Sequence, residues 1–328
     1  MLGCEDGRDG RKGGGLHELD FIARLRAMAT DPAARGLTDD AAVWRDLVLT
    51  HDMIVEGVHY LPDDRPQDVA WKLLAVNLSD LAAKGAKPEG VLMGYSMTGD
   101  AAWDAAFAEG LQEALSAFNV ALLGGDTVRM PMGAPRTLGL TAIGTAPSGG
   151  APERATMQVG DILWVSGMIG DAGLGLALRL GELQLDEALD VHAAYALPVP
   201  RLALGQALAG RVTAMMDISD GLLLDAWRMA EASGCGLTLA LDNVPLSPTY
   251  IRARGDDVAG RLAAATAGDD YELLFSAAES AAPEIFALAA ECGVPVARIG
   301  RADEGPGMRL FYKNKIVDAP EVLGFLHQ

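Results

Sequence analysis

Short acidic or glycine-acidic motifs recur along this chain, and each lies beside an apolar run or an expected helix start. Carboxylates at the ends of apolar segments would repel one another if the fold brought them together, unless cations lay between them. Mg²⁺ prefers oxygen ligands of this kind and shares them with water and substrate phosphates. The pattern therefore predicts a metal-assisted phosphate site. The motifs are Asp39-Asp40, Asp52, Asn77-Leu78-Ser79-Asp80, Gly124-Gly125-Asp126-Thr127, Asp217-Ile218-Ser219-Asp220-Gly221 and Gly268-Asp269-Asp270.

The overall charge of the chain limits the kinds of molecule that it can bind. A formal net charge of −19 argues against binding to nucleic acid or to an anionic membrane, because both require a basic surface. Anionic substrates would also be repelled unless divalent cations or local Arg and Lys reversed the field, which again favours a metal. For most of the acidic residues the simpler interpretation holds, namely that they keep an alanine-rich surface soluble.

The three cysteines, Cys4, Cys235 and Cys292, have no CxxC spacing, so neither a zinc site nor a disulfide framework is expected, and a reducing cytoplasm fits. No apolar stretch reaches the roughly 18 residues that a membrane span needs. Residues 1–15, rich in Gly, Arg, Lys and Asp, are expected to form a disordered leader.

Helical and strand patterns alternate in both halves of the chain, which predicts two α/β or α+β domains. The stretch 145–152 contains Ala, Pro, Ser and Gly and predicts the boundary between domains at 16–147 and 148–328. Helices are expected at 16–28, 69–84, 101–118, 172–180, 202–208, 222–233 and 283–292. Strands are expected at 47–50, 53–55, 90–97, 120–123, 138–144, 161–165, 213–217, 237–241, 272–276, 297–300, 308–312 and 315–317.

Taken singly, the motifs leave simpler interpretations open. The paired glycines before Asp126 could expose backbone N–H groups to a phosphate, or could merely end a strand. Either Ser219 or Asp220 could cap the following helix, although capping needs only one of them. His59 could be a structural histidine. The chain has no P-loop and no G-x-G-x-x-G after a strand, so any nucleotide is held by another device.

Read in chain order, the motifs resemble those of the thiamine-monophosphate kinase family from about residue 16 to residue 326. The acidic motifs are shared with the wider aminoimidazole-ribonucleotide-synthetase-like superfamily. Two segments are more particular to the thiamine branch, Val55–His59 and Asp270–Leu274. The resemblance implies ATP-dependent phosphorylation of thiamine monophosphate to thiamine diphosphate, with several Mg²⁺ ions. It also implies a two-domain fold and a homodimer in which the N-terminal sheets pair.

The resemblance also implies roles for individual residues. The positions that match Mg²⁺ ligands are Asp39, Thr50, His51 through its carbonyl, Asp52, Asp80, Asp126, Asp217 and Asp220. The positions that match ATP contacts are Gly125, Asp126, Arg154 and Ser219. The positions that match substrate contacts are His59, Asp269 and Phe325. No nucleophile or general base is implied, and Asp126 and Asp220 are expected to act by positioning metal and phosphate.

This chain departs from the family pattern at several positions. Thr38 replaces the usual Gly before the Asp pair, and Tyr60 replaces Phe. Asp269 replaces Glu, and Phe325 stands where Trp is common; these two changes bear on substrate affinity. The alternatives within the superfamily are an aminoimidazole-ribonucleotide synthetase, a selenophosphate synthetase or a hydrogenase-maturation protein. The chain lacks the well-placed reactive Cys of the second and the terminal Cys of the third. A non-catalytic nucleotide-binding or scaffold protein is the remaining alternative.

Overall fold

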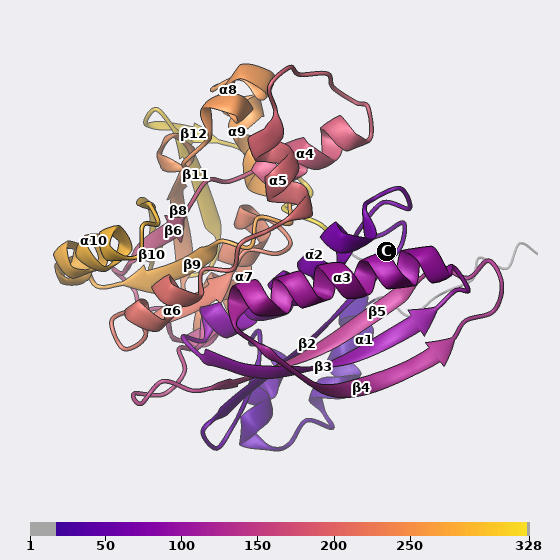
Figure 1. The fold of residues 1–328 in the computed structure, drawn as a ribbon. Coiled ribbons are helices and arrows are strands. Elements are labelled where there is room, and N and C mark those ends of the chain that lie inside the picture. The colour runs from indigo at the N-terminus through magenta and orange to yellow at the C-terminus, as the bar shows by residue number, and fades with distance from the viewer. Residues whose placement is uncertain (1–17, 327–328) are drawn as a thin grey trace, which may run out of the picture.

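The computed structural model describes residues 18–326 (Figure 1). The predicted leader, residues 1–15, lies outside the described residues. Residues 18–326 contain two β-sheets, one of five strands and one of seven, and both mix parallel and antiparallel pairs. The expected mixed α/β class is confirmed. Within residues 18–326, no helix combines the length and the apolar character required to cross a lipid bilayer.

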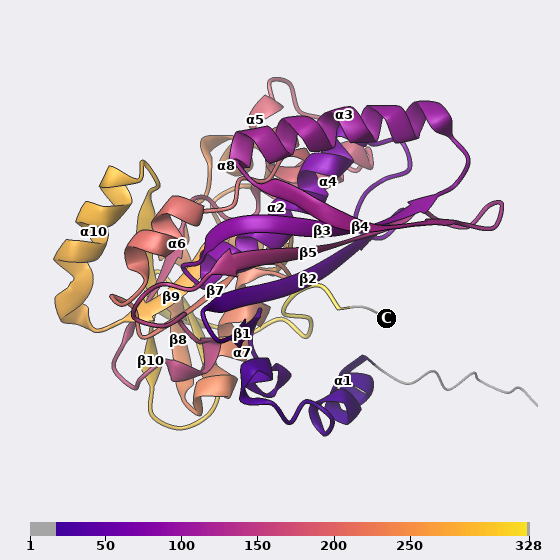
Figure 2. The same ribbon diagram turned by 60° about the horizontal axis from the view of Figure 1, so that its bottom comes forward.

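The first sheet has the order β1-β2-β5-β3-β4. Helices α2 and α3 pack together over one face of it (Figure 2), where Tyr95 of β3 meets Phe107 of α3. The elements of this half are α1 (Glu18–Arg26), η1 (Pro32–Leu37), β1 (Ala42–Trp44), β2 (Leu47–Val55), α2 (Pro66–Ala83), β3 (Lys87–Met97), α3 (Ala101–Phe118), β4 (Ala121–Arg129) and β5 (Thr137–Thr145).

The opposite face of the first sheet is open. Its side chains include Met53 and Leu92, which are 51% and 40% exposed. Strand β4 forms one edge of the sheet, and all nine of its residues are exposed. At the other edge, β1 pairs only with residues 47–49 of β2. From Thr50 onward, the outer edge of β2 therefore has no strand beside it in the described part of the chain.

The second sheet has the order β12-β11-β8-β10-β6-β9-β7. Helix α7 packs on one face, and α6 and α10 pack on the other around Trp164 and Phe275. The elements are η2 (Arg154–Thr156), β6 (Ile162–Ser166), α4 (Asp171–Arg179), α5 (Leu189–Ala196), α6 (Leu202–Leu208), β7 (Ala214–Asp217), α7 (Leu222–Ser233), β8 (Gly236–Ala240), η3 (Leu241–Asn243), α8 (Pro248–Arg254), α9 (Val258–Thr266), β9 (Leu273–Ala277), η4 (Glu279–Ala281), α10 (Ala282–Glu291), β10 (Val296–Asp303), β11 (Met308–Tyr312) and β12 (Lys315–Val317).

Helix α2 joins the two halves. It begins with Pro66 in its first turn and is buried on almost every side, as expected for a helix enclosed by a core. One side packs on β2 and β5, and another packs on β7 and α6. Gly205 of α6 permits this approach, because a Cβ there would lie 2.0 Å from the carbonyl oxygen of Ala82. The polar residues of α2 are therefore held between the two sheets.

Several sequence expectations differ from the structure. The interruption expected between 50 and 53 is absent, because β2 runs unbroken from Leu47 to Val55, and β1 was not expected. The strand expected to end before Gly124 continues as β4 to Arg129, because both glycines adopt extended backbone with φ near 155° and pair with β3. Helices α5, α8 and α9 were not expected from the sequence patterns. The expected helix 69–84 and strand 138–144 are confirmed as α2 and β5.

Candidate active site

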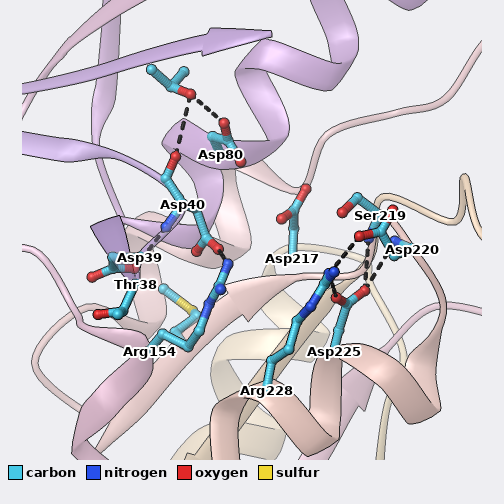
Figure 3. A network of polar contacts seen from close by, with 12 residues as sticks. Thr38, Asp39, Asp40, Asp80, Arg154, Asp217, Ser219, Asp220, Asp225 and Arg228 are labelled. Carbon is cyan, nitrogen blue, oxygen red and sulfur yellow. Dashed lines mark hydrogen bonds and ion pairs between the residues drawn. The ribbon is translucent and has the colours of Figure 1, made fainter. Parts of the chain in front are cut away.

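A cavity of about 720 Å³ is lined by residues from both halves of the chain. Part of its wall is apolar or aromatic, with Ile54, Val58, Leu176 and Phe325. The remainder is strongly charged, and Figure 3 shows much of this part. The charged lining residues are Asp40, Asp52, Asp80, Asp217, Asp220, Asp269, Arg154 and Arg228.

The Asp39-Asp40 pair is neutralised by side chains of the protein. The Lys84 ammonium is fully buried and contacts both carboxylates. Asp39 also accepts from Arg35 at 2.7 Å and does not line the cavity, whereas Asp40 lines it and pairs with Arg154. Burial alone would raise the pKa of Asp40, but Arg154 and Lys84 lower it to about 2. The ligand role predicted for Asp39 stays a prediction, and Asp40 is the member of the pair that lines the cavity.

Asp52, Asp80 and Asp217 converge from β2, α2 and β7. The hydroxyl of Thr50 donates to Asp80, and that of Ser79 donates to Asp217 at 2.6 Å. Burial, followed by the negative charge of neighbouring aspartates, raises the pKa of Asp80 and of Asp217 well above the ordinary range. Burial also raises the pKa of Asp52, to about 6. These carboxylates oppose one another's ionisation.

The Ser219-Asp220-Gly221 turn is organised by Asp225, one turn into α7. A single oxygen of Asp225 accepts from the backbone N–H groups of all three turn residues, at 3.1, 3.1 and 3.2 Å. The alternative that Ser219 or Asp220 only caps the helix does not hold, since Gly221 occupies the N-cap position and makes no side-chain cap hydrogen bond. Arg228 donates to Asp220 and, at 3.0 Å, to Asp225 (Figure 3).

The three predicted substrate residues all line the cavity. His59 is held by the backbone, since its Nδ1 accepts from the N–H of Val55 at 3.1 Å. Phe325 has a side chain that is 46% exposed, and its backbone N–H donates to the carbonyl of Asp220 at 2.8 Å. Asp269 accepts from Lys72 at 2.7 Å and from the Tyr271 hydroxyl at 3.1 Å.

Five predicted residues do not line the cavity within one chain, namely Asp39, Thr50, His51, Gly125 and Asp126. Thr50 lies beside it, since its hydroxyl donates to Asp80. The strand register places Asp126 in one row with Met53, on the open face of the sheet. Three strand spacings, roughly 14 Å, separate β4 from β2. His51 lies on that open face too, where its Nδ1 contacts the hydroxyl of Thr141 at 2.8 Å.

Sequence reasoning did not single out Arg228, Asp225, Lys84 or Lys72. The three-residue spacing between Asp225 and Arg228 is a helix-surface pairing, and it could have marked both residues. Lys72 lies on α2 and Lys84 is the C-cap residue of that helix. Only the tertiary fold shows that both are buried.

The donor set fits Mg²⁺ bound together with a phosphate substrate. Within residues 18–326, no three His, Cys, Asp or Glu side chains converge closely enough to hold an ion by themselves. Mg²⁺ commonly uses only one or two carboxylates and completes its octahedron with waters and substrate phosphates. The mutually repelling Asp52, Asp80 and Asp217 would be stabilised by such a cation.

Comparison with known proteins identifies the family. The AIR synthase related protein N-terminal domain matches residues 38–146, and the corresponding C-terminal domain matches residues 158–313. The thiamine-monophosphate kinase of Caulobacter vibrioides is 41% identical over 322 residues, covering 94% of this chain and 90% of that protein.

Solved structures agree with this family. Thiamine-monophosphate kinase from Stenotrophomonas maltophilia has a TM-score of 0.75 at 35% identity, covering 91% of this chain and 96% of that one. The structure of AaThiL complexed with AMPPCP and TMP has a TM-score of 0.80 at 27% identity, covering 94% and 97%. By sequence, fold and the arrangement of its cavity, the chain belongs to the thiamine-monophosphate kinase family of AIR synthase related proteins.

Proposed function

We propose that this chain transfers the terminal phosphate of ATP to thiamine monophosphate, giving thiamine diphosphate and ADP. The observation that carries the proposal is the division of a single cavity into a charged wall and an apolar, aromatic wall. The charged wall suits two phosphates that must be brought together, and the other wall suits a heteroaromatic substrate. The relative complexed with AMPPCP and TMP supports this pairing of ligands.

We infer direct in-line transfer. The acceptor is itself a phosphate monoester that is largely ionised near pH 7, so it needs little help from a general base. When bound, several Mg²⁺ ions would supply charge neutralisation between the two phosphates. The cavity's aspartates, led by Asp52, Asp80, Asp217 and Asp220, would hold those ions. Arg154 would orient the nucleotide phosphates, and Ser219 would contact them by its hydroxyl.

The experiment is an assay with ATP, Mg²⁺ and thiamine monophosphate that follows thiamine diphosphate. Product formation at a rate comparable to ADP release supports the proposal. ADP formed only with another acceptor would assign the chain to a different branch of the superfamily. Stereochemistry tests the mechanism, because in-line transfer predicts inversion at a chiral transferred phosphorus. Net retention, or an isolated phosphorylated enzyme, contradicts direct transfer.

We further propose that the active form is a homodimer built on the open edges of the first sheet. Edge strands with unpaired N–H and C=O groups are templates for pairing with another chain. Here β4 of one copy would lie beside the free edge of β2 in the other. That arrangement would place Gly125 and Asp126 of one copy next to the 50–52 segment of its partner, which carries predicted ligands on both faces.

Introducing a lysine on the edge strand β4 tests the proposed dimer. Val128→Lys puts a charge on β4 beside Asp126, at a side chain that is 50% exposed in one chain. We expect a shift from dimer to monomer in sedimentation and a loss of activity. Leu180→Lys is the matched control, because Leu180 is 52% exposed but follows α4 in the other half of the molecule. An unchanged mass for the Val128 variant contradicts the proposed interface.

A further inference from the structure

Lys72 is an unusual cation for the middle of a helix enclosed by the core. Its side chain is 3% exposed, and its Nζ lies 2.7 Å from Oδ2 of Asp269. The same ammonium lies 4.3 Å from the ring centroid of Tyr195. A buried ammonium is costly unless it is paired, and here a carboxylate and an aromatic face both compensate its charge.

Asp269 is held on its other side as well. The Tyr271 hydroxyl donates to Oδ1 of Asp269 at 3.1 Å. Both residues have left-handed backbone, with φ of 68° for Asp269 and 49° for Tyr271. Their N–H groups donate to the carbonyls of Ser219 and Ile218 at 2.8 Å. Tyr271 adopts this conformation because the surroundings hold it there, and the hydrogen bonds from Lys72 and Tyr271 fix the direction of the Asp269 carboxylate.

The negative charge of the Asp269 carboxylate is largely compensated by Lys72, but its oxygens can still accept hydrogen bonds. Each oxygen of Asp269 has one protein donor, and a carboxylate oxygen can accept about two hydrogen bonds. Its side chain is 28% exposed and lines the cavity. A ligand can therefore donate to Asp269, while Lys72 already supplies the counter-charge.

We propose that Lys72 is a positioning residue that sets substrate recognition by Asp269. It fixes the carboxylate as an acceptor for the exocyclic amino group of the substrate's pyrimidine and cancels the charge that would otherwise attract the thiazolium cation. Recognition at this position depends on a hydrogen-bond donor of the ligand and not on its positive charge. The inference rests on the proposed function and names the feature of the substrate that this site selects.

The test compares thiamine monophosphate with its oxythiamine analogue, in which the pyrimidine amino group is replaced by oxygen. Wild-type enzyme should prefer the amino substrate in kcat/KM by ~10–100-fold, because the analogue leaves Asp269 without its donor. Lys72→Met should raise KM for thiamine monophosphate about tenfold, the scale of one good hydrogen bond, and reduce the preference. KM for ATP should not change. Asp269→Asn should abolish most of the preference.

Lys87→Met is the matched control, since Lys87 is exposed on β3 and pairs with Glu89. It should leave both KM values and the preference unchanged. If Lys72 only ties the two halves together, Lys72→Met will lower the melting temperature while wild-type preference for the amino substrate is retained, and the inference is overturned. Calorimetric titration of each variant with thiamine monophosphate alone provides a second readout. If wild-type enzyme does not phosphorylate thiamine monophosphate at all, the proposed function fails instead.

Discussion

Strands β4 and β7 are both edge strands that carry a predicted ligand, but their surroundings differ completely. All four residues of β7 are buried, because α2 and η2 cover that edge within the same chain. All nine residues of β4 are exposed. Asp217 on β7 therefore reaches the cavity by folding alone, whereas Asp126 on β4 does not. This difference is the reason for proposing that two chains share the phosphate site.

The largest expected loss of turnover comes from neutralising one carboxylate, either on β7 or on β4. Asp217→Asn and Asp126→Asn should each lower turnover by at least ~100-fold, the scale of one preorganised charge-stabilising group. Asp220→Asn should do the same. Asp126→Asn should leave the melting temperature unchanged, since Asn keeps the shape of the side chain and Asp126 is exposed within its own chain. Near-normal turnover of the Asp126 variant at saturating Mg²⁺ would remove β4 from the site.

Mixing the two inactive variants tests whether the site is shared between copies. In a dimer with one Asp126→Asn chain and one Asp217→Asn chain, one site carries both changes and the other carries neither. Random exchange should therefore restore about a quarter of wild-type activity. Activity that stays at the level of the separate variants would mean that Asp126 acts within its own chain or not at all.

Phe325 lies on neither β4 nor β7, and its replacement is expected to have an effect of intermediate size on substrate binding. Phe325→Ala removes an aromatic surface from the cavity wall, so we expect KM for thiamine monophosphate to rise roughly tenfold, as for a loss of stacking and apolar contact. KM for ATP should be unchanged. Equal changes in both KM values, or a lower melting temperature with normal KM, would show that Phe325 only packs the end of the chain.

The smallest expected effect concerns pH, and it involves the free edge of β2. The pKa of Asp52 is raised to about 6, so the folded state binds a proton more tightly than the unfolded state. This contribution to stability is complete below the unfolded pKa of about 4 and is lost as pH rises through 6. Without divalent ions, the melting temperature of wild type relative to Asp52→Asn should therefore fall between pH 4 and pH 7.

Mg²⁺ should reverse this dependence of the melting temperature on pH, because metal ligands must be deprotonated before they bind. Added Mg²⁺ should raise the melting temperature more at pH 7 than at pH 5, and Asp52→Asn should weaken the difference. An equal rise at both pH values would exclude Asp52 as a ligand.

Much of this arrangement could be predicted from the sequence because it is local. Helix α2 and strand β5 follow from periodicity, and the acidic motifs indicate the charged wall of the cavity. The Gly124-Gly125 pair was misread as the end of a strand, since glycine also permits the extended backbone seen in β4. The retention of Asp39 by Lys84 and Arg35 depends on contacts that form in the folded chain, and no spacing in the sequence contains that information.

Most of the site contacts that the sequence did not predict are made by long side chains. Lys72 meets Asp269 across 197 residues of sequence, and Arg154 meets Asp40 across 114. Such pairs form only after the two sheets have packed on α2. Helix α9 was missed for a different reason, because it is only nine residues long and carries Gly260 in its first turn, which weakens the helical signal.

The turn ahead of α7 has a consequence for how a nucleotide can be held. Asp225 already accepts from the backbone N–H groups of Ser219, Asp220 and Gly221, so those amides are not available as the phosphate cradle that a P-loop provides. Phosphates bound beside this turn would then depend on ionic contacts from side chains and metal ions. Contacts of that kind are screened by dissolved salt over about 10 Å at 0.1 M. Affinity for ATP should accordingly weaken with rising ionic strength, far more than affinity for the uncharged part of the acceptor.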